Sequence, residues 1–162
     1  MTFRRSPVLW TAAAFAAVLI PLHAQQAAVP TAAAPDTSPQ VLDVQGGRIR
    51  VVTVASGLFH PWSFAFLPDG RSILVAERDG RLRLIRNDTL LPDPIWTSPT
   101  PKGQGGDALH AVAVHPKFAQ NGLVYMSYPK QGERGSTLAI ARGHLRGHTL
   151  GDVEEIFVAH AW

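Results

Sequence analysis

Residues 63–86 read SFAFLPDGRSILVAERDGRLRLIR, and this stretch decides the fold. Two turn signals divide it: Pro68-Asp69-Gly70, where proline presets φ and glycine supplies a positive φ, and Asp79-Gly80, a strong hairpin signal. The segments around these turns have the length and the apolar or β-branched content of strands. They are Ser63–Leu67, Ser72–Glu77 and Arg81–Arg86. The stretch therefore predicts three short strands joined by tight turns.

The same order recurs in residues 110–130, HAVAVHPKFAQNGLVYMSYPK. Pro116 follows Pro68 by 48 residues, and Gly122 follows Gly70 by 52. Ser136–Leu145 matches the third strand of the first unit, and Val153–Val158 supplies a fourth. A repeat of about 50 residues with three or four strands is typical of propeller blades. The prediction is an all-β chain holding the first two to three blades of a β-propeller, with a small β-sandwich as the alternative.

The N-terminal region has a different character. Residues 1–24 have the pattern of a signal peptide, with Arg4 and Arg5 before an apolar run and a small residue, Ala24, at the cleavage position. An uncleaved anchor is the alternative. Residues 25–40 are rich in Ala and Pro and predict a linker or a functionless remnant. Residues 41–162 are expected to form the N-terminal part of the propeller, with an early strand at Ile49–Val54.

Composition limits the partners and the compartment. The chain has 15 basic and 12 acidic residues, and two of the basic ones lie in the predicted signal peptide. The scattered remaining charges argue against a nucleic-acid or anionic-membrane partner, beyond a possible signal anchor. The chain has no cysteine, which excludes disulfides and thiolate metal sites. An exported protein of this kind fits the bacterial periplasm or secretion.

One loop is a candidate binding element. Gly103-Gln104-Gly105-Gly106-Asp107 lies between the predicted blades, and three of its residues lack a Cβ, which lets the backbone approach a ligand closely. The Gln104 side chain offers both a donor and an acceptor, which suits sugar hydroxyls or quinone carbonyls. A flexible turn without function is the alternative.

Other polar and aromatic residues favour structural roles. Glu77 ends a predicted strand and is expected to pair with Arg83 on the neighbouring strand, with catalysis as the alternative. His110 and His115, five apart on a predicted strand, would point to opposite faces and could not chelate one metal. His115 is expected to cap the strand end, and Trp62 to pack in the core or between blades. No metal ligand is assigned within the chain.

Taken in order, several motifs resemble the glucose/sorbosone dehydrogenases, the soluble aldose dehydrogenase family that uses pyrroloquinoline quinone (PQQ). The resemblance covers residues 57–157 and is specific because the motifs recur in the family's order and spacing. They are PWSFAFLPDGR (61–71), AERDGRLR (76–83), GQGG (103–106), VAVHPKFAQN (112–121) and VYMSY (124–128).

The resemblance implies a six-bladed propeller, PQQ in a central polar pocket, calcium holding the cofactor, and export. It also implies that a histidine base takes the proton of the sugar's anomeric hydroxyl while hydride passes to the quinone. Gln104 maps onto the family's glutamine near substrate and cofactor. An external electron acceptor is implied as a further partner.

This chain departs from the family pattern at two places. Residues 107–110 make the segment after GQGG longer than usual, which could re-aim the loop. The family's catalytic histidine, its arginine and its calcium ligands are expected beyond Trp162, and His160 comes too early to match that histidine. The chain as given is therefore not expected to catalyse by itself. The competing hypothesis is a non-catalytic exported propeller that binds a glycan or a protein partner.

Overall fold

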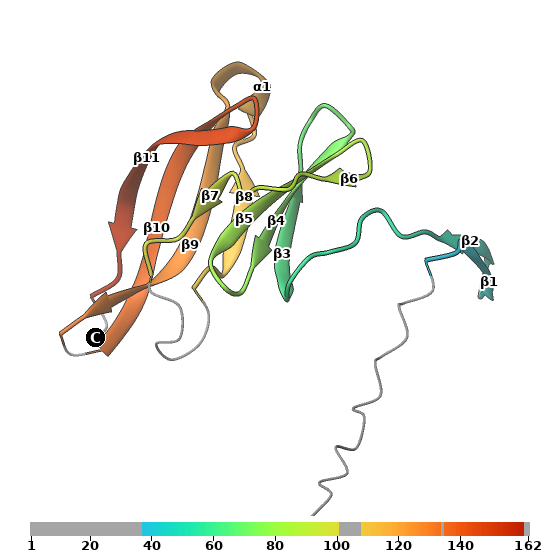
Figure 1. Ribbon diagram of the computed structural model, residues 1–162, viewed down its shortest axis with the longest axis horizontal. Helices are drawn as coiled ribbons and strands as arrows, with labels where there is room; N and C mark the ends of the chain where they lie inside the picture. The colour runs from blue at the N-terminus through green and yellow to red at the C-terminus, as the bar shows by residue number, and fades with distance from the viewer. Residues whose placement is uncertain (1–36, 101–107, 134, 161–162) are drawn as a thin grey trace, which may run out of the picture. The chain divides into compact units, whose positions relative to one another are not determined.

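The computed structural model describes residues 37–100, 108–133 and 135–160, which are almost entirely β-structure (Figure 1). The chain divides into two units, residues 1–36 and 37–162, and the described residues all belong to the second. The predicted signal peptide and most of the predicted linker therefore lie outside the described residues. In the part of the chain that is described, no helix is long and apolar enough to span a membrane.

The first sheet contains residues 63–86, the stretch with the two glycine-containing turns. Its strands are β3 (Pro61–Phe66), β4 (Ser72–Glu77), β5 (Arg81–Arg86), β6 (Thr89–Leu90) and β7 (Trp96–Thr97). They pair antiparallel in the order β3-β4-β5-β6, and β7 also pairs with β5. The turn between β3 and β4 has Gly70 at φ +71°, and the turn between β4 and β5 has Gly80 at φ +98°. Both glycines therefore have the positive φ that the sequence predicts for these turns.

The second sheet repeats this plan. Its strands are β8 (Ala111–Val114), β9 (Leu123–Gly132), β10 (Gly135–Arg146) and β11 (Thr149–Val158). They pair antiparallel in chain order. A single helical turn, α1 (Phe118–Asn121), lies between β8 and β9 and was not predicted. It ends at Gly122, whose φ of +64° and N–H bond to the Phe118 carbonyl, at 2.7 Å, close the helix.

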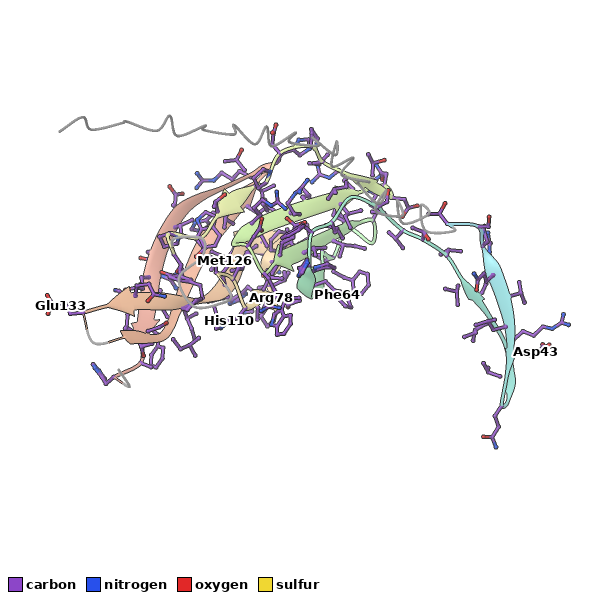
Figure 2. All side chains as sticks on the ribbon, turned by 60° about the horizontal axis from the view of Figure 1, so that its bottom comes forward. Asp43, Phe64, Arg78, His110, Met126 and Glu133 are labelled. Atoms are coloured by element: carbon purple, nitrogen blue, oxygen red, sulfur yellow. The ribbon has the colours of Figure 1, made fainter. Side chains whose placement is uncertain are left out.

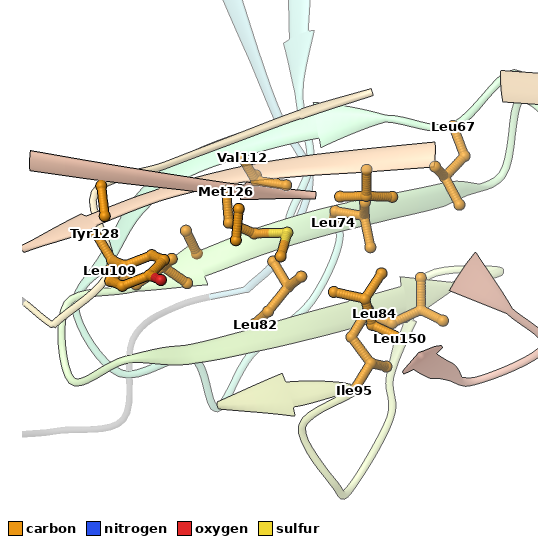
Figure 3. Packing of buried hydrophobic residues seen from close by; sticks show 14 residues of the cluster. Leu67, Leu74, Leu82, Leu84, Ile95, Leu109, Val112, Met126, Tyr128 and Leu150 are labelled. Carbon is orange, nitrogen blue, oxygen red and sulfur yellow. The ribbon is translucent and has the colours of Figure 1, made fainter. Parts of the chain in front are cut away.

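One hydrophobic core joins the two sheets (Figure 3). Leu74, Leu82 and Leu84 of the first sheet have no exposed surface, and they pack in one cluster with Val124 and Met126 of the second. The inward residues of β9 alternate with half-buried ones, as expected for a strand with one face in a core. The two sheets therefore share the buried face that neighbouring blades are expected to share.

The opposite face of the first sheet is apolar as well. Trp62, Phe64 and Phe66 of β3 are 57 to 67% exposed. They line a hollow of about 540 Å³ together with Ile73 and Val75. Trp62 therefore does not pack in the core that the two sheets share. The reason is that β3 is the edge strand, and the shared core lies on the other side of its sheet. The alternative, that Trp62 packs between blades, stays a prediction.

A separate two-stranded hairpin precedes these sheets, formed by β1 (Gln40–Val44) and β2 (Gly47–Val51). The predicted strand at Ile49–Val54 is thus present, but it begins and ends earlier and pairs with a strand that was not predicted. All residues of both strands are exposed.

Candidate functional site

The candidate site lies where the segment that contains Gln104 leaves and rejoins the sheets. Gln104 itself falls within residues 101–107, outside the described residues, so the structure describes only the two flanks of its segment. Ser98 and Thr100 lie on the first flank, and Ala108 and His110 on the second. We call this region, together with the β4–β5 turn and the end of β9, the loop end.

Both flanks bond to the same two elements. The Ser98 N–H donates to the Gly80 carbonyl at 2.8 Å, and the Ala108 N–H donates to the Arg78 carbonyl at 2.7 Å. On the other side, the Thr100 hydroxyl donates to the Pro129 carbonyl, and the His110 N–H donates to the Ser127 carbonyl at 2.8 Å. Figure 2 labels Arg78 of the β4–β5 turn and His110 of the second flank. The segment therefore starts and ends on one wall made by the two sheets.

A buried carboxylate supports this wall from within the first sheet. Glu77 has no exposed surface, and its Oε1 accepts the N–H of Phe59 at 2.6 Å. Its Oε2 lies 2.7 Å from Arg81 Nε and 3.5 Å from Arg83 Nη1. The predicted Glu77–Arg83 pair is thus confirmed, and Arg81 is the nearer cation. A buried carboxylate needs such partners, and this one has them on both oxygens, which favours the structural role.

Arg83 also ties this ion pair to the rest of the sheet. Its Nη2 donates to the carbonyl oxygens of Leu91 and Pro92, at 2.8 and 3.2 Å. Its side chain is only 7% exposed. Because the planar guanidinium presents several donors at fixed angles, one side chain can hold the Glu77 carboxylate and two backbone carbonyls at once.

A hollow of about 330 Å³ with several polar side chains among its lining residues opens beside the first flank. Its lining residues are Pro99, Thr100, Tyr128, Lys130, Gln131 and Glu155. At its centre, Glu155 accepts the Tyr128 hydroxyl at 2.9 Å through Oε2 and Lys130 Nζ at 2.5 Å through Oε1. The hollow therefore presents a carboxylate, an ammonium and hydroxyl groups side by side, which are groups that hydrogen-bond to hydroxylated ligands.

The charges in this hollow are fixed by its contacts. Burial raises the pKa of Tyr128 to about 12, and the hydrogen bond to Glu155 adds to this effect. The hydrogen bond from Lys130 holds the pKa of Glu155 below its usual range, with a smaller contribution from Tyr128. At neutral pH the group therefore consists of a neutral phenol and an anionic carboxylate, with the lysine ammonium as the partner of the carboxylate.

Sequence reasoning did not find this hollow. The alternation along β9 could have placed Tyr128 on the inward face, but Glu155 depends on the pairing of β10 with β11. That pairing shifts register between Ile140 and Ala141 and again between Arg142 and His144. Such irregularities leave no clear signal in the sequence.

His110 and His115 do not lie on one strand, although the sequence predicted that they would. β8 covers only Ala111–Val114, so His110 and His115 flank it. His115 was expected to cap the strand end. Its side chain instead bonds within the segment that follows β8: its Nδ1 accepts the Lys117 N–H at 2.9 Å and lies 3.0 Å from Asn121 Nδ2. His160 is exposed. Among the described residues, no three His, Asp or Glu side chains are grouped to hold a metal ion.

Comparisons with known proteins show which family the chain resembles. The family model described as glucose/sorbosone dehydrogenase matches residues 58–161. The chain is 33% identical over 135 residues to the uncharacterized protein slr1608 of Synechocystis, covering 78% of this chain and 32% of that protein. It is 33% identical over 98 residues to the aldose sugar dehydrogenase YliI of Escherichia coli, covering 60% and 26%.

A solved structure extends the likeness to three dimensions. The PQQ-bound form of an aldose sugar dehydrogenase from Streptomyces coelicolor superposes with a TM-score of 0.56 at 26% identity, over 78% of this chain and 36% of that one. The chain thus spans about a third of the length of the proteins it matches. The two stacked sheets are the blades of that propeller fold rather than a small sandwich. The chain belongs to the glucose/sorbosone dehydrogenase family.

Proposed function

We propose that the whole protein is an exported, PQQ-dependent dehydrogenase of aldose sugars. The observation that carries this proposal is the family match over residues 58–161, supported by a relative whose structure holds PQQ. In the proposed reaction, the C1–H bond of the sugar breaks and its electron pair passes as hydride to the quinone. The anomeric O–H proton goes to a histidine base, the C1=O bond forms, and an external acceptor reoxidises the cofactor.

The described residues account for only part of such a site. They contain no group of three His, Asp or Glu side chains placed to hold calcium, so we assign neither the calcium ligands nor the histidine base to them. What they supply is the loop end. We propose that Gln104 binds substrate or cofactor with its side-chain amide, and the hydrogen bonds of the flanking residues Ser98 and Ala108 near this hollow support that proposal.

The N-terminal sequence supports a proposal for the cellular location of the protein. Residues 1–24 have the charge and apolar pattern of an export signal, and we propose a periplasmic or secreted protein. Its partners would be a sugar and an electron acceptor, without nucleic acid or membrane beyond a possible signal anchor.

The test uses the complete protein, loaded with PQQ and calcium. We expect reduction of an artificial dye with aldoses and an upward shift of the melting temperature on addition of PQQ. Gln104→Ala should raise the KM for sugar or the Kd for PQQ about tenfold or more, because a lost hydrogen bond in a binding site costs about 1–3 kcal/mol. Gln120→Ala, at an exposed position of α1, is the matched control. No dye reduction together with no PQQ-dependent shift would refute the enzyme and favour the non-catalytic binder.

A further inference from the structure

The β4–β5 turn, Arg78–Gly80, holds both flanks of the segment that contains Gln104. We infer that Glu77 and Gly80 are positioning residues for the loop end: Glu77 fixes the turn, and the bare Cα of Gly80 lets both flanks close on it. This inference rests on the proposed function in one respect, because the consequence for ligand binding requires that the loop end be the binding region.

The first step is the shape of the turn. The Gly80 N–H donates to the Glu77 carbonyl at 3.0 Å, which closes the turn, and the Arg78 N–H donates to the His60 carbonyl at 3.1 Å. The buried Glu77 carboxylate bonds to Phe59 in front of β3 and to Arg81 at the start of β5. The turn is therefore held from three strand ends by a side chain that water does not reach.

The second step is the contact between the turn and the flanks. The two backbone carbonyls of the turn, those of Arg78 and Gly80, each accept one flank N–H, from Ala108 and Ser98 respectively. A Cβ placed on Gly80 would lie 3.0 Å from the Ala108 Cβ and 3.4 Å from the Ser98 Cβ. Ser98 and Ala108 are 7% and 3% exposed. Both flanks thus pack against residue 80, and a side chain there would push them apart.

The third step separates this steric role from the ordinary need for glycine in a turn. Gly80 has φ +98°, which an L-residue rarely adopts, so any substitution there strains the backbone. Gly70, in the β3–β4 turn, has a comparable φ of +71°, but a Cβ added to it would meet nothing within 4 Å. Gly70→Ala therefore carries backbone strain without the contact to the flanks, and it is the matched control for Gly80→Ala.

The experiment compares three variants of the complete protein: Gly80→Ala, Gly70→Ala, and Gly80→Ala combined with Ala108→Gly. The double variant removes the Cβ that the new methyl group would meet. Amide hydrogen exchange at Ser98 and Ala108 reports the two flank bonds directly and does not depend on activity. We expect exchange about tenfold faster or more in Gly80→Ala than in Gly70→Ala, and partial recovery in the double variant.

Steady-state kinetics with PQQ, calcium and an aldose then test the consequence for the site. Displaced flanks should raise the KM for sugar or the Kd for PQQ in Gly80→Ala by about tenfold, with a smaller change in kcat. Gly70→Ala should stay near the parent protein in both. If circular dichroism shows that Gly80→Ala does not fold, Glu77→Gln takes its place in the same experiments. It weakens the buried ionic contacts that hold the turn and hardly changes the volume of the side chain.

The outcomes separate the two proposals. Equal exchange at Ser98 and Ala108 in the Gly80 and Gly70 variants would overturn the inference, whether or not the protein is active. Faster exchange with unchanged KM and Kd in an active enzyme would also overturn it, because the flanks would then not position the binding region. A parent protein without activity would refute the proposed function alone, and the exchange data would still decide whether the turn holds the flanks.

Discussion

The protonation of Tyr128 gives the sharpest physical test of the hollow that it lines together with Lys130 and Glu155. The sequence given has two tyrosines, Tyr125 and Tyr128, so the difference between a Tyr125→Phe protein and one with both replaced by Phe isolates the Tyr128 phenol. Tyr128 is 4% exposed, and its hydroxyl donates to the anionic Glu155 at 2.9 Å. Both the burial and the neighbouring negative charge disfavour the phenolate, which raises the pKa from 10.0 to about 12.

The magnitude follows from that difference. A pKa raised from 10.0 to about 12 corresponds to roughly 3 kcal/mol of preference for the neutral phenol in the folded protein. Because the folded pKa is the higher one, this stabilisation is fully present below about pH 10 and is lost as the pH rises through about 12. The free energy of unfolding of the Tyr125→Phe protein should therefore fall by up to roughly 3 kcal/mol across that window from this group alone.

The assay has two parts. Tyrosinate absorbance is followed against pH while circular dichroism confirms that the protein is still folded. Urea unfolding is then compared between Tyr125→Phe and the protein with both tyrosines replaced by Phe, which shares every other titrating group. The difference between the two stability curves should show the loss expected from Tyr128. If the absorbance difference between the two folded proteins shows Tyr128 titrating near 10, the buried Tyr128–Glu155 contact is refuted and, with it, the charge assignment of the hollow.

Three further predictions concern stability, each measured by urea unfolding. Leu82→Ala should lower the free energy of unfolding by about 2–5 kcal/mol because Leu82 has no exposed surface in the shared core, whereas Leu138→Ala, at a 41% exposed position, should cost about 1 kcal/mol or less. His115→Ala should cost about 1 kcal/mol, because it removes the acceptor at the start of α1. The hydrogen bond from Ser72 lowers the pKa of Asp69, so its stabilisation should be lost as the pH falls through that lowered pKa; Asp69→Asn should remove this part of the acid dependence, and an unchanged acid profile would contradict it.

The strands of the first sheet could be predicted because their limits are set locally. β4 and β5 have the predicted bounds, 72–77 and 81–86, since a proline- or glycine-containing turn lies at the start of each. The likeness between residues 63–86 and 110–130 then indicated the second sheet and the blade repeat. Motif order along the chain indicated the family, which the match over residues 58–161 confirms.

What could not be predicted depends on contacts between distant residues. Tyr128 and Glu155 meet only because of the bulged register of β10 with β11, which no local pattern specifies. Trp62 was expected to pack in the core or between blades, and the local sequence does not say which face of an edge strand is covered. The role of Gln104 lies outside the described residues and stays a prediction.

The Asp79-Gly80 pair shows how one local signal can serve two purposes. In the sequence it marks a hairpin, and the φ of Gly80 agrees with that. The geometry of the hairpin explains why residue 80 is a glycine. It does not explain why the Cα of this glycine lies against another segment of the chain. That second requirement comes from Ala108, which lies 28 residues further on and packs against it. A substitution at Gly80 therefore strains the turn and displaces the flanks together, and stability data alone could not separate the two effects. Replacing Ala108 by glycine in the same protein removes only the second effect, so the part that the double variant recovers measures how strongly the first sheet holds the candidate binding segment.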